Sequence, residues 1–276
     1  AFDGSLAAKG RYDLRDATPR FTAVTTVKGM DLTQLLNALA PSAAANIRGR
    51  LNLDLDVAGA GKEWEVAQKT LKGQGKVQVI DGALLNFNIA DSVLSGTLIQ
   101  LIPGDIKTKY PEIFTAKDTE FKQLAGSATI ANGRAYTNDL VIAAAEFETR
   151  PKGWFAFDQT VDFSGPLLFS TRLSQDIIGR AREMKNLANE QGRILIPYTL
   201  AGKLPGAKPR PDLGYIARAM QKGFIDQGVE RFLRGRSPRE GSDPTGGDEG
   251  KTGRQQRKRR DTPEDILRGL EGFFRR

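Results

Sequence analysis

Apolar and polar residues alternate along most of the first two thirds of the chain, which is the period of a β-strand with one buried face. Within residues 51–57, leucine or valine occupies every odd position and asparagine or aspartate every even position. Short connections rich in Gly, Pro, Asn and Asp join weaker versions of this pattern, which indicates an antiparallel meander. The further strands are expected near residues 8–15, 20–29, 74–80, 83–88, 125–131, 134–146, 153–158, 160–171 and 194–203.

One strand pattern occurs twice, at residues 75–84 and again at residues 126–135. Each copy begins with Gly, continues with apolar residues at every second position, and reaches Asp81-Gly82 or Asn132-Gly133. These dipeptides tolerate the positive φ that both central residues of a type I′ turn require, so the pattern predicts a hairpin at each place. Repeated hairpins favour a curved, groove-like sheet over a compact catalytic pocket.

Four segments with a helical period interrupt the predicted strands, so the expected fold class is mainly β with packed helices. Asp31 is a capping residue for the first segment. The second spans about residues 89–101 and is stopped by Pro103, the third spans about residues 174–190, and the fourth begins at Asp212.

Composition excludes several kinds of chemistry, because the chain of 276 residues contains neither cysteine nor histidine. Disulfides, zinc-cysteine sites and Ser-His-Asp triads are therefore unavailable, and we expect no enzyme activity, no metal and no cofactor. The net charge of +8 comes without a basic patch interleaved with aromatic residues, so nucleic acid is not an expected partner. No run of eighteen apolar residues marks a membrane-spanning helix.

The composition changes near residue 235, which predicts a division into a β-rich domain at 1–234, a disordered basic linker at 235–261 and an amphipathic helix at 262–276. That helix is too short to be stable alone in water, so its apolar face needs a covering surface. A membrane interface, a partner groove and the parent domain itself are the alternatives. The candidate contact residues are Arg257, Lys258, Arg259, Arg260, Leu270, Phe273 and Phe274.

Five short stretches, taken in their order and spacing, resemble the C-terminal region of the AsmA family: residues 29–32, 71–82, 88–90, 121–133 and 192–197. The resemblance covers about residues 1–234. It implies a bridge-like lipid-transfer and envelope-assembly protein in the periplasm of a Gram-negative bacterium, anchored to the inner membrane by an N-terminal helix absent from this chain. It also implies a role in phospholipid transport between the inner and outer membranes and in outer-membrane assembly or integrity.

A groove for acyl chains needs apolar residues on one face of the sheet and no reactive groups, which agrees with the alternation in this chain. The candidate lining residues are Leu53, Leu55, Val77, Val79, Leu84, Ile130 and Leu140. Each of them also fits a plain core beneath covering helices. The expected partners are phospholipid and either an envelope membrane surface or another envelope protein. A structural scaffold that binds another envelope protein is the alternative function, followed by a hydrolase based on paired carboxylates.

Overall fold

A computed structural model describes residues 3–39 and 44–221 of the chain. All of them belong to one compact unit, Ala1–Leu233. The predicted linker at 235–261 and the predicted helix at 262–276 lie outside the described residues.

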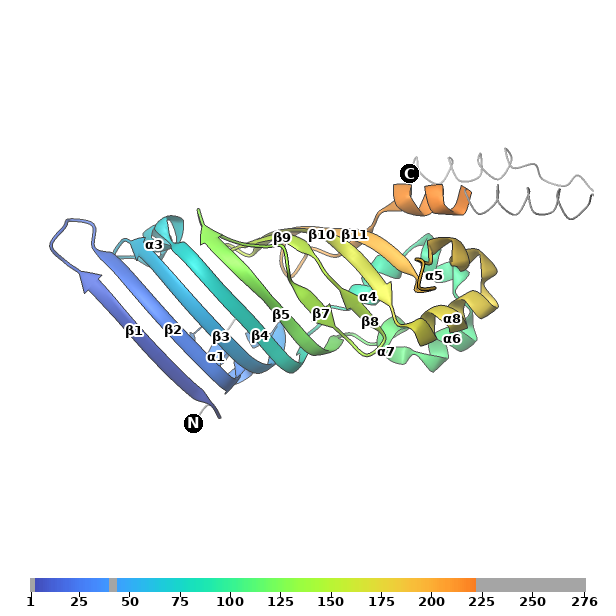
Figure 1. Cartoon of the computed structure of the whole chain (residues 1–276), viewed down its shortest axis with the longest axis horizontal. Coiled ribbons are helices and arrows are strands. Elements are labelled where there is room, and N and C mark those ends of the chain that lie inside the picture. The colour runs from blue at the N-terminus through green and yellow to red at the C-terminus, as the bar shows by residue number, and fades with distance from the viewer. Residues whose placement is uncertain (1–2, 40–43, 222–276) are drawn as a thin grey trace, which may run out of the picture. The chain divides into compact units, whose positions relative to one another are not determined.

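An antiparallel β-sheet forms most of the described unit, as the alternation predicted (Figure 1). Its first five strands are neighbours in sequence and in space, which makes this half a simple meander. The strands in sheet order are β1 (Ser5–Asp13), β2 (Arg20–Asp31), β3 (Ile47–Ala60), β4 (Lys72–Leu84), β5 (Thr119–Ala131), β6 (Arg134–Thr137), β9 (Lys152–Ala156), β10 (Thr160–Phe169), β11 (Leu195–Lys203) and β12 (Arg210–Pro211). Two short strands complete the sheet: β7 (Val141–Ala143) pairs with β5 and β8, and β8 (Phe147–Thr149) pairs with β7 and β10.

The two copies of the repeated pattern adopt different structures. Asn132 and Gly133 form the predicted two-residue turn between β5 and β6, with φ of 53° and 73°. The hairpin predicted at Asp81-Gly82 is wrong, because both residues lie inside the continuous strand β4. There they oppose the single residue Gly49 of β3 and form a β-bulge, and of these two residues only Asp81 has positive φ, of 49°.

Packing between strands explains why Gly82 belongs to a bulge and not to a turn. A Cβ at this position would lie 2.4 Å from the carbonyl oxygen of Arg48 and 2.6 Å from the ring of Phe121. A second irregularity in β2, between Val27 and Met30, places the positive-φ residue Gly29 beside Asn52 of β3. Bulges bend strands and increase their twist, so these two support the curvature that was predicted for the sheet.

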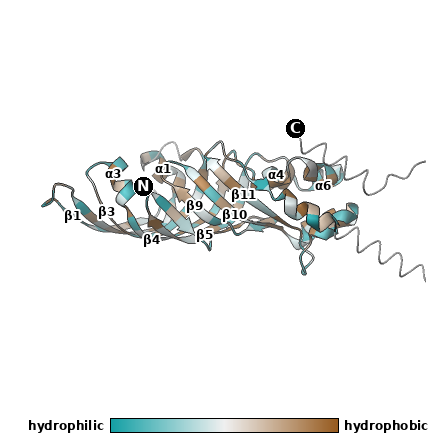
Figure 2. Ribbon diagram, turned by 90° about the horizontal axis from the view of Figure 1, so that it is seen from above, coloured by the Kyte–Doolittle hydropathy of each residue, from teal (hydrophilic) through white to brown (hydrophobic). Residues whose placement is uncertain are grey.

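Helices lie at both ends of the long strands and along one face of the sheet. Figure 2 shows α1 and α3 on the same side of the strands β3 and β4. Side-chain oxygens cap several helices, and Asp31 accepts from the amide of Gln34 at 3.0 Å, as predicted. The helices are α1 (Leu32–Leu39), α3 (Trp64–Thr70), α4 (Ile89–Leu94), α5 (Thr97–Leu101), α6 (Gly104–Lys109), α7 (Pro111–Phe114), α8 (Thr171–Arg180), the 3-10 helix η1 (Arg182–Leu187) and a helix whose described part is 213–221.

Two of the predicted helices are divided in the structure. The segment at 89–101 breaks at Gly96, whose φ of 75° ends α4, and the segment at 174–190 breaks at Ala181 between α8 and η1. The sequence pattern did not predict α3, α6 or α7, and α6 begins directly after Pro103, the residue expected to end the helix at 89–101.

The core consists of two separate clusters on the same face of the sheet. The larger one packs α4 to α8 and η1 against the sheet, and Leu94, Leu167 and Leu173 are fully buried in it. The smaller one centres on Val57 and Ile130, beneath α3 and near the opposite ends of the strands. Between these clusters the apolar face has only partial cover.

Candidate functional site

The apolar face of strands β1 to β5 is built from rows of side chains that run across the strands. Strand pairing aligns Leu6, Val27, Leu53 and Val77 with Gly126 in one row. Because alternate residues of a strand share a face, every second residue along these strands adds another row to the same surface. The next row consists of Ala8, Thr25, Leu55, Gly75 and Ala128.

This second row lies between the two core clusters and is composed mostly of small side chains. Thr25, Leu55, Gly75 and Ala128 are all half-buried. Leu55 is the one large side chain among them, and its Cδ1 would lie 3.2 Å from a Cβ at Gly75. The row therefore forms a half-buried floor of mostly small side chains between the two better packed regions.

Cover on the apolar face decreases toward β1. Leu6 and Tyr12 lie on the same face as Val27 and Phe21, yet they are 55% and 51% exposed. Tyr12 stacks on Phe21 with 6.4 Å between ring centroids, and its hydroxyl donates to the carbonyl of Gly61 at 3.3 Å. The apolar face is thus open to solvent at its β1 end.

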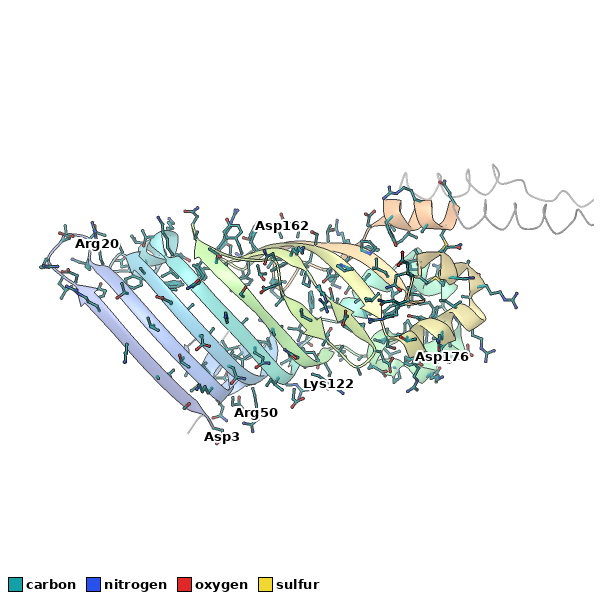
Figure 3. The ribbon with its side chains drawn as sticks, viewed as in Figure 1. Asp3, Arg20, Arg50, Lys122, Asp162 and Asp176 are labelled. Atoms are coloured by element: carbon teal, nitrogen blue, oxygen red, sulfur yellow. The ribbon has the colours of Figure 1, made fainter. Side chains whose placement is uncertain are left out.

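The opposite face of the same strands is polar and internally hydrogen-bonded. The Thr26 hydroxyl donates to Asp54 at 2.9 Å, and the Asn52 amide donates to Gln78 at 3.2 Å across β3 and β4. In Figure 3, Arg20 lies at one end of the long strands and Arg50 lies toward the other. The two faces therefore differ sharply in chemistry, as the odd and even positions of 51–57 predicted.

The structure places the seven candidate lining residues in three different environments. Leu53, Val77 and Leu84 are half-buried against the larger cluster, whereas Val79 belongs to that cluster and is only 2% exposed. Leu55 packs against the smaller cluster, in which Ile130 is buried. Leu140 is half-buried and its backbone packs over Gly126, where a Cβ would lie 2.9 Å from the Leu140 Cα.

Several residues of the apolar face were missed by the sequence reasoning. Val27, Thr25 and Ala128 are row partners of the candidates, and the alternation in 20–29 and 125–131 already marked their side of each strand. Gly75 and Gly126 were missed because a glycine carries no hydropathy signal, although their lack of a side chain shapes the floor. The candidate residues at 257–260, 270, 273 and 274 lie outside the described residues.

A polar cluster joins α6 to α8, and its chemistry is that of a structural contact. Asp176 accepts from Lys109 Nζ and from the Tyr110 hydroxyl, each at 2.5 Å. The Lys109 ammonium, followed by the Tyr110 hydroxyl, lowers the pKa of Asp176, while burial is the main cause that raises the pKa of Tyr110. A carboxylate held ionised in this way is a poor proton donor at neutral pH.

No carboxylate side chain is buried in the described part of the chain, so a buried carboxylate pair is not seen there. The buried polar side chains there are Asn88, Thr119, Thr149 and Ser174, and each carries an amide or a hydroxyl group. Within the same residues, no three acidic side chains gather where they would hold a metal ion. Of the described helices, none is long and apolar enough to cross a membrane.

The fold and its site define a class: an antiparallel β-sheet protein with one polar face and one partly covered apolar face. The chain belongs to the AsmA family, whose family model matches residues 2–140, half of the chain. That match runs from the start of the described sheet through the β5–β6 hairpin and includes α4 to α7. Comparison with curated proteins and with solved structures finds no match.

Proposed function

We propose that this chain is a non-catalytic module of a cell-envelope protein that holds the acyl chains of phospholipids along its apolar sheet face. The observation that carries the proposal is the half-buried row of Thr25, Leu55, Gly75 and Ala128, which crosses four strands between two packed clusters. A surface of this kind takes up apolar ligands without any reactive group.

The energetics favour a ligand that contacts the whole row. Neighbouring strands are about 4.8 Å apart, so a row across β1 to β5 spans roughly 19 Å. Each methylene removed from water contributes about 0.8 kcal/mol, and about 14 of them would contribute roughly 11 kcal/mol before the cost of ordering the chain. The affinity would be distributed along the row, so no individual side chain should dominate it.

Family membership supports the wider setting of the proposal. The module would act in the periplasm of a Gram-negative bacterium, in phospholipid transport between the inner and outer membranes and in outer-membrane assembly or integrity. An N-terminal helix outside this chain would anchor the protein to the inner membrane. The envelope membrane surface is the proposed partner of the basic run at 257–260 and the segment at 262–276.

A specific observation also favours the scaffold function. Strand β1 pairs with β2 on one side, and no described strand pairs with its other side over nine residues. Such an edge accepts an added strand from another protein through backbone hydrogen bonds. If another envelope protein bound at this edge and no lipid bound on the apolar face, the scaffold function would explain the protein better than the lipid function.

Native mass spectrometry of the purified 276-residue chain, followed by lipid extraction, tests the lipid proposal. We expect copurified phospholipid, reduced in Leu55→Glu because a carboxylate in the central row disfavours acyl chains. Thr22→Glu is the matched control, since it adds the same charge on the exposed polar face of the neighbouring strand β2, opposite Arg11. Absence of lipid from the parent protein, or equal lipid in both folded variants, contradicts the proposal.

A further inference from the structure

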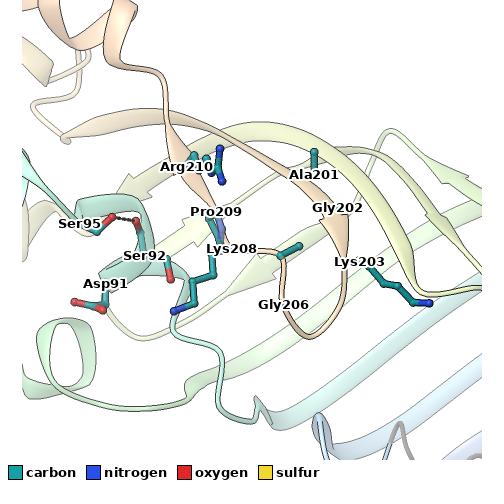
Figure 4. A pocket seen from close by; sticks show the side chains of 11 residues that line it. Asp91, Ser92, Ser95, Ala201, Gly202, Lys203, Gly206, Lys208, Pro209 and Arg210 are labelled. Atoms are coloured by element: carbon teal, nitrogen blue, oxygen red, sulfur yellow. Dashed lines mark hydrogen bonds between the residues drawn. The ribbon is translucent and has the colours of Figure 1, made fainter. Parts of the chain in front are cut away.

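A second concave site lies outside the apolar row, between α4 and the connection that joins β11 to β12. The cavity measures about 620 Å³, within the range of roughly 300–1,000 Å³ that is usual for ligand pockets. Figure 4 shows its two walls, one carrying Ser92 and Ser95 and the other carrying Lys208 and Arg210. Its lining is mostly polar, in contrast with the apolar row.

The charges around this cavity are unbalanced. Lys203, Lys208 and Arg210 line it together with a single carboxylate, Asp91. None of the three cations forms an ion pair with another described residue, and in Figure 4 Lys208 extends toward Ser92. Lys203 extends away from Ser92 and Lys208 in Figure 4, and its charge acts on Asp158, which lies outside the cavity lining. Lys208 and Arg210 therefore outnumber the one carboxylate, Asp91, and the Ser92 hydroxyl can donate a hydrogen bond, both of which suit an anion. The Ser95 hydroxyl already donates to the Ser92 carbonyl at 2.7 Å.

Both walls are held in place by buried neighbours. The inner side of α4 is fixed in the larger cluster, where Ala90, Val93 and Leu94 are fully buried. On the other wall, Lys208 lies between the buried residues Ala207 and Pro209. Serine hydroxyls and cations on fixed backbones lose less entropy when they bind a ligand than the same groups on a free loop do.

We propose that this cavity binds a phosphate group, supplied by the headgroup of an anionic phospholipid, through Lys208, Arg210 and the Ser92 hydroxyl. Guanidinium and ammonium groups with a neighbouring hydroxyl are the usual donors to phosphate oxygens. The choice of a headgroup over free phosphate rests on the proposed lipid function. The phosphate contact itself follows from the cavity and its charges.

Calorimetric titration of the full chain with three probes tests this site: a short-chain phosphatidylglycerol below its micelle concentration, inorganic phosphate, and a short-chain diacylglycerol. The test variant is Lys208→Gln/Arg210→Gln, and Lys208→Gln alone serves if the double variant melts earlier. The matched control is Lys9→Gln/Arg11→Gln, which removes the same two charge types from exposed positions of β1. We expect the phosphatidylglycerol affinity to fall roughly tenfold in the test variant and to change less than about twofold in the control.

The probes separate this site from the lipid function. Phosphate binding that depends on Lys208 and Arg210, without any lipid binding, would retain the anion site and remove the lipid function. Equal affinity for phosphatidylglycerol and diacylglycerol, unchanged in the test variant, would retain acyl binding and overturn the phosphate site. Absence of binding to both anionic probes overturns it as well.

Discussion

The two ends of the apolar sheet face share one sequence pattern and differ in what covers them. Around β10 and β11, helices α4 to α8 bury the face so completely that Leu94, Leu167 and Leu173 are inaccessible to solvent. At β1 the same alternation leaves Leu6 and Tyr12 more than half exposed. Alternation therefore specifies which side of a strand is apolar, while the helices that pack on that side decide whether it becomes core or surface.

The largest expected effect comes from a charge in the covered region. Val79→Asp places a carboxylate where the native side chain is 2% exposed, beneath the helices of the larger cluster. An unpaired buried charge costs several kcal/mol, comparable with the whole stability of a domain, about 5–15 kcal/mol. We expect loss of the cooperative thermal transition in circular dichroism. Thr22→Asp, on the exposed face of β2 opposite Arg11, should melt like the parent.

Survival of a folded Val79→Asp protein would show that the face at Val79 is open to water. In that case Val79 would line the groove directly, and the variant should bind less phospholipid. The boundary between core and groove would then lie closer to α4 than the exposed fractions indicate.

A pair of leucine truncations compares the two ends directly. Leu94→Ala should cost about 2–5 kcal/mol because it leaves a cavity in a closely packed core. Leu6→Ala should cost no more than about 0.5 kcal/mol, since the side chain is 55% exposed. Urea denaturation measures both values. Similar costs at the two positions would contradict the contrast and would indicate that something covers β1 in solution.

Local sequence rules predicted the elements whose determinants lie within a few residues. The alternation at 51–57, the Asn132-Gly133 turn and the Asp31 cap each depend on near neighbours, and each is present in the structure. The faces of the strands followed from the same rules, and the role of the candidate lining residues stays a prediction.

The features that the sequence predicted wrongly or not at all depend on contacts between residues far apart in the chain. Asp81-Gly82 has the same turn chemistry as Asn132-Gly133, but the Arg48 carbonyl and the Phe121 ring hold Gly82 inside a strand. The sequence likewise did not show which candidate lining residues are buried, because their burial depends on how α4 to α8 pack on the sheet. The anion cavity was missed for the same reason, since its two walls are more than a hundred residues apart in sequence.

Two glycine substitutions test the difference between the copies of the repeat. Gly82→Val should destabilise the protein by about 1–3 kcal/mol or more, because its Cβ would overlap the Arg48 carbonyl and the Phe121 ring. Gly133→Val should cost about 1–3 kcal/mol from strain alone, since φ is 73° and the nearest heavy atom lies 3.9 Å from the added Cβ.

Asparagine variants at the same two positions then separate overlap from strain. Gly133→Asn should recover most of the loss at the turn, because asparagine tolerates the left-handed region. Gly82→Asn should recover nothing, since any Cβ meets the same atoms. Thermal melting of the four variants provides the test. Recovery at both positions would mean that backbone strain, and not steric overlap, explains the loss of stability at Gly82 as well as at Gly133.

The smallest expected effect concerns the polar contact that holds α6 against α8 at the covered end. Asp176 accepts from Lys109 and Tyr110, and these bonds lower its pKa below the value of an unfolded aspartate, near 3.8. A group with a lowered folded pKa contributes stability at pH values above the unfolded pKa, and this contribution is lost as the pH falls through the folded pKa. Asp176→Asn should therefore lower the urea midpoint slightly at pH 7, and the difference from the parent should shrink as the pH falls below about 4. A difference that stays constant over this range would show that the asparagine acts through packing and not through the lost charge. Unchanged midpoints at both pH values would show that the Lys109–Asp176 contact contributes nothing to the cover, and the contrast between the two ends would then depend on apolar packing alone.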